Sequence, residues 1–159
     1  MTPLPASQAP FVDEDLVFRV LRLANLIARP FQGSFGTRFD LSLAEWRVVL
    51  VLAAHPRVSA TEVAERTGMH VMNVSRSVAR LVRMGRVTRG VDPSDRRRAV
   101  LRLTRKGLAM YRQIAPSAQA REEAVRQVLS TREKAQLRAM LDRLSEHVQA
   151  SGAGSEPAR

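Results

Sequence analysis

Apolar residues recur along this chain mostly at the spacing of an α-helix. Residues 13–30 carry an apolar stripe in steps of four, three and four, and the same steps return after Ser130. A stripe of this period gives a helix one buried face. We expect a first helix from Asp13 that Pro30 ends, because proline cannot donate the next backbone hydrogen bond. We expect a last helix opened by Ser130 and Glu133, which have capping-box spacing.

Two more helices are predicted by their first residues. Ser42 and Glu45 also have capping-box spacing, which favours a helix from residue 43 onward. Thr104 can cap a long helix that we expect to reach about Leu129, with a bend at Pro116.

The stretch from Ser59 to Gly85 predicts two short helices joined by a tight turn. Ser59 and Glu62 have capping-box spacing, and Gly68 ends the first helix because glycine readily adopts a left-handed conformation. The second helix has an apolar stripe on one face and cationic and amide groups on the other, as in a helix-turn-helix, although charged helix faces are more often only solvated surface. The stripe is Val71, Val74, Val78 and Leu81, and the polar face is Asn73, Arg76, Arg80 and Arg83.

The hydrophobic period changes to two after this pair of helices. Residues 85–91 and 99–103 alternate apolar and polar positions, and residues 92–98 between them read Asp-Pro-Ser-Asp-Arg-Arg-Arg, a turn. A cationic β-hairpin directly after a helix-turn-helix is typical of a winged helix, whose second helix enters the major groove of DNA. The predicted fold is mainly α with a small β-wing, a winged helix-turn-helix domain plus a helical dimerisation region, with about six helices and a β-hairpin.

The charge of the chain supports a polyanionic partner. The formal net charge is +11, from 26 Lys and Arg against 15 Asp and Glu. Thirteen basic residues face only four acidic ones between Arg57 and Lys106, and nearly all of them are arginines. A field of this sign favours nucleic acid, and the planar arginine fork suits phosphates and guanine edges.

Residue types that other activities need are missing or scattered. The chain has no cysteine, and His55, His70 and His147 lack metal-binding spacing, so disulfides, thiolate zinc sites and other metal sites are not indicated. We see no nucleophile with a paired base and no phosphate-binding glycine loop, and we expect neither an enzyme nor a cofactor. The first ten residues do not resemble a signal peptide, and no apolar run approaches the ~20 residues that span a bilayer, so we expect a cytoplasmic protein.

Composition divides the chain into five expected segments. More apolar surface lies outside the winged domain than that domain can cover, which predicts a second copy of the chain as partner. The segments are a flexible N-terminal arm (1–12), a dimerisation helix and linker (13–40), the winged helix-turn-helix domain (41–104), C-terminal dimerisation helices (105–150) and a disordered tail (151–159).

These motifs resemble the MarR family of bacterial transcriptional regulators across about residues 13–150. The segment from Asp92 to Lys106-Gly107 is similar to the family's wing pattern D-x-R-D-x-R, followed by a strand that ends in Leu-Thr and a Lys-Gly pair. Val74-Ser75-Arg76 matches the V-T/S-R of the recognition helix. Ser94 departs from the pattern because it occupies the place of the first wing arginine. Either another wing arginine, Arg96 or Arg98, then enters the minor groove, or the wing contributes less to binding.

The resemblance implies a homodimer whose first, fifth and sixth helices intertwine and whose winged units bind a palindromic operator about one DNA turn apart. It also implies a repressor that a small aromatic acid, phenolic or carboxylate, releases from DNA. Release requires only that the ligand bind the misspaced dimer better, and ~1 to 3 kcal/mol of difference changes operator affinity by roughly 5- to 150-fold.

Candidate DNA contacts on the helix-turn-helix lie in both of its helices. Asn73 can pair with adenine and Arg76 with guanine, and Ser75 lies between them, although each could equally contact a phosphate. Ser59 and Thr61 begin the first helix, where free N–H groups can meet a phosphate, although capping alone explains Ser59.

The remaining DNA candidates are arginines on the second helix and in the wing. Arg80 is a candidate contact, and it is expected, with Arg83 and Arg86, to touch phosphates or stay solvated. The wing offers Arg96, Arg97 and Arg98, and the resemblance implies that Asp95 supports the wing tip by pairing with Arg97. An exposed ion pair of little energetic value is the alternative for Asp95 and Arg97.

A ligand pocket is expected between the dimer helices and the winged unit. Trp46 could supply a flat wall, and Arg38, Arg47 or His70 could meet a carboxylate. Trp46 also lies on an apolar stripe, so core packing is the simpler explanation for it. His70 begins the recognition helix, where a turn residue or a phosphate contact explains it as well.

Two other functions remain open at this stage. A nucleoid-type or RNA-binding module would use the same charge without sequence choice and without a ligand switch, whereas a repressor should prefer its operator by roughly 10³-fold or more. Binding to a membrane surface would need bulky aromatic residues among the arginines, and here a wing takes their place, so we expect double-stranded DNA and no membrane.

Overall fold

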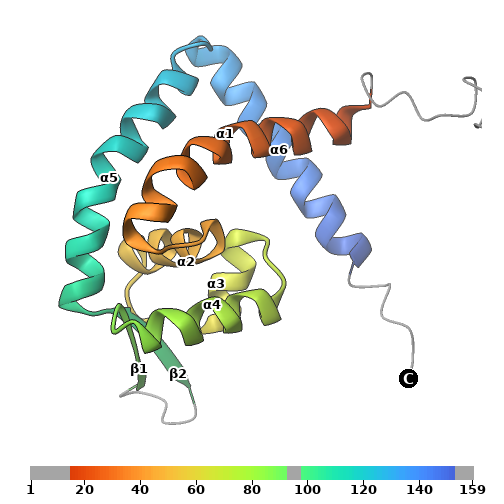
Figure 1. The fold of residues 1–159 in the computed structure, drawn as a ribbon. Helices are drawn as coiled ribbons and strands as arrows, with labels where there is room; N and C mark the ends of the chain where they lie inside the picture. The colour runs from red at the N-terminus through yellow and green to blue at the C-terminus, as the bar shows by residue number, and fades with distance from the viewer. Residues whose placement is uncertain (1–14, 93–97, 153–159) are drawn as a thin grey trace, which may run out of the picture. The chain divides into compact units, whose positions relative to one another are not determined.

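A computed structural model describes residues 15–92 and 98–152 of the chain (Figure 1). This part of the chain forms six helices and one antiparallel β-hairpin, which confirms the predicted fold class. It divides into two compact units, one ending at Ile114 and the other beginning at Ala115. In chain order the elements are α1 (Leu16–Phe39), α2 (Leu43–Ala54), α3 (Ala60–Thr67), α4 (Val71–Arg83), β1 (Val87–Val91), β2 (Ala99–Leu103), α5 (Arg105–Arg126) and α6 (Thr131–Gly152).

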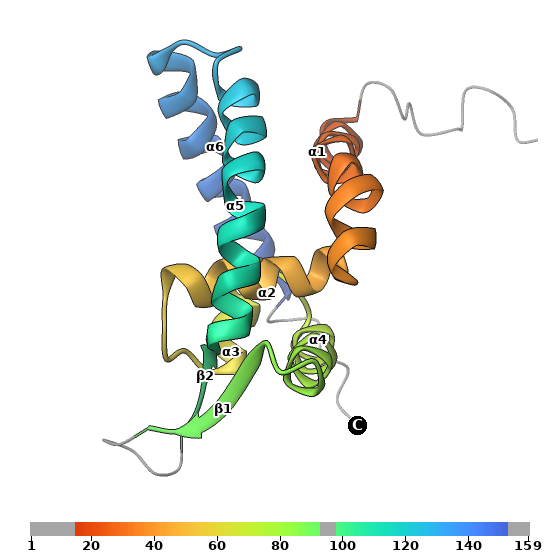
Figure 2. The same ribbon diagram turned by 60° about the vertical axis from the view of Figure 1, so that its left-hand side comes forward.

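The core of the first unit lies where α2, α3 and α4 meet the hairpin. Helix α2 packs against both α3 and α4, and Figure 2 views α4 end-on with α2 crossing above it. The apolar stripe predicted for α4 is the buried side of that helix, except that Val71 at its first position is exposed. Fully buried aliphatic side chains fill the space between the elements, among them Val48, Val49, Val63, Val74, Val78, Leu81, Val100 and Leu101.

The hairpin is fixed to the helices at its base. Strand β1 pairs with β2 in antiparallel register from Val87 opposite Leu103 to Val91 opposite Ala99. The segment between α2 and α3 adds a short third edge, because the Leu101 N–H donates to the Val58 carbonyl at 2.8 Å. The base of the wing is therefore part of the core.

A glycine is required where α5 begins beside the end of α4. A Cβ at Gly107 would lie 2.1 Å from the Arg86 carbonyl oxygen, a distance that no side chain tolerates. The Thr104 hydroxyl donates to the Gly85 carbonyl at 2.7 Å and accepts from the Gly107 N–H at 3.1 Å. The Leu-Thr and Lys-Gly pattern thus closes the corner between β2 and α5.

The prediction that Pro30 ends the first helix is wrong. Helix α1 continues through Pro30 to Phe39, and Asp40 terminates it in a left-handed conformation at φ 47°. Phe31 is buried and its ring stacks on Trp46 with centroids 5.8 Å apart. This tertiary packing offsets the hydrogen bond that proline cannot make. The helix bends in its second half, as a proline in a helix interior favours (Figure 1).

The second unit consists of the later part of α5 and all of α6. The predicted capping box of the last helix is confirmed, because the Ser130 N–H donates to the Glu133 carboxylate at 2.8 Å and the Ser130 hydroxyl accepts from the Glu133 N–H at 3.3 Å. Helix α5 continues through Pro116 and ends at Arg126. None of the helices in the two described ranges is long and apolar enough to cross a membrane.

Two helices keep apolar faces exposed within their own units. Helix α1 exposes eight large apolar side chains between Leu16 and Ile27, and α6 exposes five between Leu137 and Val148. Each set contains a stripe at helical spacing, of the kind that normally packs against another surface. The stripes are Leu16, Val20, Leu23 and Ile27 on α1 and Leu137, Leu141, Leu144 and Val148 on α6.

Candidate nucleic-acid interface

The exposed side of α4 presents polar groups because the opposite side is anchored in the core. Val74 and Val78 are fully buried, whereas Asn73 and Arg76 are exposed and Ser75 is half-buried between them. Within residues 15–92 and 98–152, Asn73 and Arg76 have no ion pair or side-chain hydrogen bond to another residue. Their amide and guanidinium groups are therefore available to an external partner.

The turn before α4 positions the start of this helix. Gly68 has φ 66°, the left-handed conformation predicted for it, and the Thr67 hydroxyl donates to the Val63 carbonyl at 2.7 Å. His70 caps α4, because its Nδ1 accepts from the Met72 N–H at 3.2 Å. One nitrogen of the His70 ring therefore caps the helix, while the ring as a whole is exposed at the helix start.

The start of α3 is capped as predicted. The Ser59 N–H donates to the Glu62 carboxylate at 2.8 Å, and the Ser59 hydroxyl accepts from the Glu62 N–H at 3.2 Å. The amide and hydroxyl of Ser59 therefore both have partners within the helix. Thr61 is exposed in the first turn of the same helix.

Two ion pairs hold the wing against the helical part of the unit. Arg98, just before β2, donates to the Glu62 carboxylate of α3 at 2.5 Å, and Arg57 pairs with Asp92 at 3.3 Å. The Arg98 hydrogen bond, helped by those of Ser59, lowers the pKa of Glu62 from 4.5 to about 2. The other wing candidates, Asp95, Arg96 and Arg97, lie outside the described residues.

Arg80 does not project into solvent beside Arg76, which corrects the expectation for the polar face of α4. Its guanidinium donates to the Glu45 carboxylate and to the Asp40 carboxylate, each at 2.6 Å. The hydrogen bond to Glu45, followed by the one to Asp40, raises the pKa of Arg80. Arg80 therefore joins α4 to the corner between α1 and α2.

Arg86 is a structural residue that sequence reasoning placed wrongly among solvated or phosphate-binding arginines. It is 9% exposed, and it donates to the Phe39 carbonyl and, at 3.3 Å, to the Asp40 carbonyl. Burial lowers the pKa of Arg86. Its partners lie more than 40 positions away in the sequence, so no local spacing could have revealed them.

The four candidate ligand residues have different surroundings. Trp46 is 5% exposed and stacks between Phe31 and Tyr111, so core packing accounts for it. Arg38 lies over the ring of Phe39, 5.2 Å from its centroid. Arg47 is exposed on α2, and His70 caps α4.

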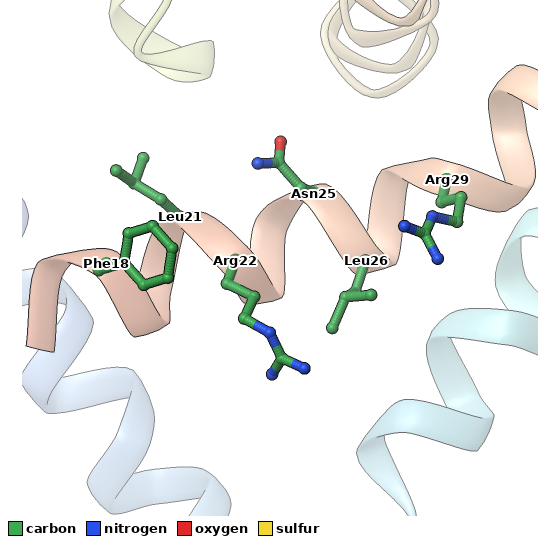
Figure 3. A pocket seen from close by; sticks show the side chains of 6 residues that line it. All are labelled: Phe18, Leu21, Arg22, Asn25, Leu26 and Arg29. Carbon is green, nitrogen blue, oxygen red and sulfur yellow. The ribbon is translucent and has the colours of Figure 1, made fainter. Parts of the chain in front are cut away.

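A hollow of about 500 Å³ lies along α1, and none of those four candidates lines it. Figure 3 shows its side chains projecting from a single stretch of the helix. Two arginines and an amide lie among apolar groups there, and those apolar groups belong to the exposed face of α1. The lining residues are Phe18, Leu21, Arg22, Asn25, Leu26 and Arg29.

The described ranges contain no cluster of three or more His, Asp or Glu side chains that could hold a metal ion. The arrangement built from α3, α4 and the wing base is instead a surface of amide, hydroxyl and guanidinium groups on a rigid frame. Such groups bind nucleic acid without any bond-breaking chemistry.

Comparison with known proteins identifies relatives of this arrangement. A model described as the MarR family matches residues 39–98, from the end of α1 to the start of β2. An uncharacterised HTH-type transcriptional regulator, YfiV of Bacillus subtilis (strain 168), is 26% identical over 97 residues. The aligned part spans 61% of this chain and 61% of the relative's own length.

Three solved structures share the fold. A MarR/EmrR family transcriptional regulator from Acinetobacter sp. ADP1 superposes with a TM-score of 0.80 at 23% identity, covering 89% of this chain and 99% of that one. CouR from Rhodococcus jostii RHA1, bound to p-coumaroyl-CoA, has a TM-score of 0.75 at 20% identity, covering 87% of this chain and 95% of CouR. MepR from S. aureus, in a complex with DNA, has a TM-score of 0.72 at 19% identity, covering 84% of this chain and 98% of MepR. The Acinetobacter and Bacillus subtilis proteins are named as transcriptional regulators.

Proposed function

We propose that this chain is a transcriptional regulator of the MarR family that binds a palindromic operator in double-stranded DNA as a homodimer. One observation carries the proposal. The exposed side of α4 offers Asn73 and Arg76 without internal partners among the described residues, beside a wing base tied to α3. The structural neighbour MepR, whose crystal contains DNA, gives independent support.

In the proposed complex α4 reads base edges in the major groove. Asn73 can make a bidentate pair with adenine and Arg76 with guanine, while Ser75 donates to either a base or a phosphate. Thr61 at the start of α3 contacts a phosphate of the DNA backbone through its hydroxyl, whereas Ser59 contributes mainly by capping α3. Each good bidentate pair would supply ~1 to 3 kcal/mol of discrimination against the wrong base.

The proposed wing contacts come from arginines near the hairpin tip. Arg98 is held by Glu62, and a phosphate could replace that carboxylate because both are oxyanions. Arg96 or Arg98 stays the prediction for the minor groove, and the pairing of Asp95 with Arg97 stays the prediction for support of the wing tip. Arg80 is proposed to act mainly inside the protein, because Asp40 and Glu45 already occupy its guanidinium.

The homodimer is supported by the exposed apolar stripes of α1 and α6. The α1 stripe includes side chains that are 60% exposed at Leu16 and 53% exposed at Ile27, unusual values for a continuous apolar face. Packing of these stripes against a second copy would remove them from water and bring two α4 helices to one duplex.

We further propose that a small aromatic acid, phenolic or carboxylate, releases the repressor from DNA. The neighbour CouR holds p-coumaroyl-CoA, the thioester of a phenolic acid. Arg38, Trp46, Arg47 and His70 stay predictions for the same ligand. If His70 links ligand and DNA, His70→Ala should abolish release while operator affinity is kept, and unchanged release would remove it from the switch.

Selection of bound duplexes from a random-sequence pool tests the DNA part of the proposal. Purified protein should enrich a palindrome with two half-sites about one helical turn apart, preferred over random DNA by roughly 10³-fold at physiological salt. Sedimentation of the selected complex should give two chains per duplex. Equal retention of all sequences would reject the proposal and favour a nucleoid-type module without sequence choice.

Screening a panel of aromatic acids against the complex with the selected duplex tests the ligand part. At least one phenolic or carboxylate compound should lower operator affinity by roughly 5- to 150-fold. Aliphatic acids of similar charge serve as controls for simple ionic competition. Equal effects of aromatic and aliphatic acids would reject a specific effector.

A further inference from the structure

We propose that Arg80, Arg86, Asp40 and Glu45 form a clamp that fixes the angle between α1 and α4 and thereby sets the half-site spacing that the dimer accepts. The inference rests on the proposed function, because it assumes two copies of α4 on one duplex. All four are positioning residues: they act through α4, whose Asn73 and Arg76 would touch the bases.

The two arginines of the clamp converge on the carboxyl end of α1. Arg86 donates to the carbonyls of Phe39 and Asp40, and Arg80 donates to the Asp40 carbonyl at 3.3 Å and to its carboxylate at 2.6 Å. The last carbonyls of a helix lack hydrogen-bond donors within it and carry partial negative charge. The two arginines supply both the donors and the positive charge. The carboxyl end of α1 is thus attached directly to α4 and to the residue that precedes β1.

The clamp is anchored in the core at its second carboxylate. Glu45 is 3% exposed, and its carboxylate accepts from the Ser42 N–H at 2.8 Å as well as from Arg80 at 2.6 Å. Arg86 is also buried, so neither of these side chains is free to change rotamer in solvent. Charge-assisted hydrogen bonds with several partners fix direction as well as distance.

The same helix that the clamp holds also carries the stripe proposed for the dimer. The exposed apolar residues of α1 lie between Leu16 and Ile27, and the clamp grips its other end at Phe39 and Asp40. One continuous helix, bent in its second half, therefore runs from the proposed partner contact to the end that the clamp attaches to the DNA-reading helix. A change in the angle between α1 and α4 would move each α4 relative to the two-fold axis, and so change the distance between them.

Duplexes with altered spacers test the clamp. The selected palindrome is compared with versions that have one base pair added or removed between the half-sites, a shift of about 3.4 Å along the axis. The wild-type protein should lose at least tenfold in affinity on both altered duplexes, and Arg86→Met should lose less than threefold. A base substitution inside a half-site should cost the two proteins the same factor, because the reading residues are unchanged.

A second variant and a matched control keep the result interpretable. Asp40→Asn removes the carboxylate but suits the left-handed conformation of this position, so it should fold and show the same loss of spacing preference. Arg83→Met changes an exposed arginine in the last turn of the same helix and should keep the wild-type preference.

The possible failures can be told apart. A merely structural role would lower affinity equally for all duplexes and leave the spacing ratio at its wild-type value in Arg86→Met and Asp40→Asn, and that result would overturn the clamp alone. A wild-type protein that ignores the spacer, or needs only one half-site, would overturn the proposed dimeric function and the clamp with it.

Discussion

The two halves of α4 look alike in the sequence and differ in the structure. Arg76 and Arg80 lie one helical turn apart, on the same predicted polar face. Arg76 is exposed, whereas Arg80 is bound to two carboxylates at the corner of α1 and α2. The difference arises because α2 crosses over the C-terminal half of α4, where Glu45 and Asp40 meet it. Helical position alone therefore does not tell a DNA contact from an internal ion pair.

This contrast assigns recognition to the N-terminal half of α4 and attachment to its C-terminal half. The N-terminal half enters the groove first in helix-turn-helix proteins, which leaves the other half free for packing. Substitutions at Glu45, Arg76 and His70 can break or sharpen the assignment, and one at Glu62 tests the attachment of the wing beside it.

The largest effect on folding is expected from Glu45→Ala in the attached half. Removing a buried carboxylate leaves Arg80 with Asp40 only and the Ser42 N–H without its acceptor. We expect the free energy of unfolding to fall by about 2 to 3 kcal/mol, somewhat below the usual cost of breaking a fully buried pair because Arg80 keeps some solvent. Urea denaturation measures this change in the free energy of unfolding. Glu65→Ala, an exposed carboxylate on α3, is the control and should change stability by less than about 0.5 kcal/mol.

Arg76→Ala in the recognition half should give the opposite pattern. Affinity for the selected duplex should fall by about 1 to 3 kcal/mol, with relaxed preference at one base pair, while the melting temperature stays at the wild-type value. Fluorescence anisotropy with a labelled duplex measures the affinity. Arg112→Ala on α5 serves as the control for loss of one positive charge. A large drop in melting temperature with intact binding would reverse the assignment of the two halves.

A smaller effect is expected from Glu62→Gln, which weakens the tie between α3 and the wing. At pH 7 this substitution should lower the free energy of unfolding by about 0.5 to 1 kcal/mol, as for a partly exposed ion pair. The folded-state pKa of about 2 is lower than the usual 4.5, so the stabilisation is present above pH 4.5 and is lost as the pH falls toward 2. Denaturation at pH 7 and at pH 2 should therefore show that the difference in free energy of unfolding between the wild type and Glu62→Gln becomes smaller in acid. A difference that does not change with pH would show that the charge of Glu62 is not its source.

The smallest effect is expected at the start of the recognition half. His70→Ala removes the acceptor for the Met72 N–H and should cost about 0.5 kcal/mol, and His70→Asn should recover it, because asparagine is a good N-cap. Thermal unfolding of the three proteins measures this order. An alanine variant as stable as the wild type would show that the histidine cap adds nothing.

Features that depend on neighbours in the sequence were predictable. Ser42, Ser59 and Ser130 cap helices through a glutamate three positions later, and all three capping boxes are present. The left-handed Gly68 and the switch to strand period after Gly85 are local in the same way. Local chemistry determined these elements, so the winged helix-turn-helix could be predicted from the sequence.

Features that depend on distant partners were not predictable. Arg80 and Arg86 find Asp40 and Glu45 across 35 to 46 positions, and several exposed arginines of similar spacing do not. Pro30 continues a helix because Phe31 packs on Trp46, a contact that outweighs the local preference of proline. In the candidate site, Asn73 and Arg76 were placed correctly on an exposed face, but which arginines are engaged inside the protein became visible only in three dimensions.

The aromatic stack gives this protein a built-in optical reporter. Trp46 is the only tryptophan, and it lies between Phe31 of α1 and Tyr111 of α5, with ring centroids 5.8 and 6.0 Å away. Indole emission is sensitive to the distance and polarity of such neighbours. Intrinsic fluorescence excited at the indole band would thus follow small movements of either helix in unlabelled protein, and a stopped-flow trace on mixing with DNA or an aromatic acid would time them.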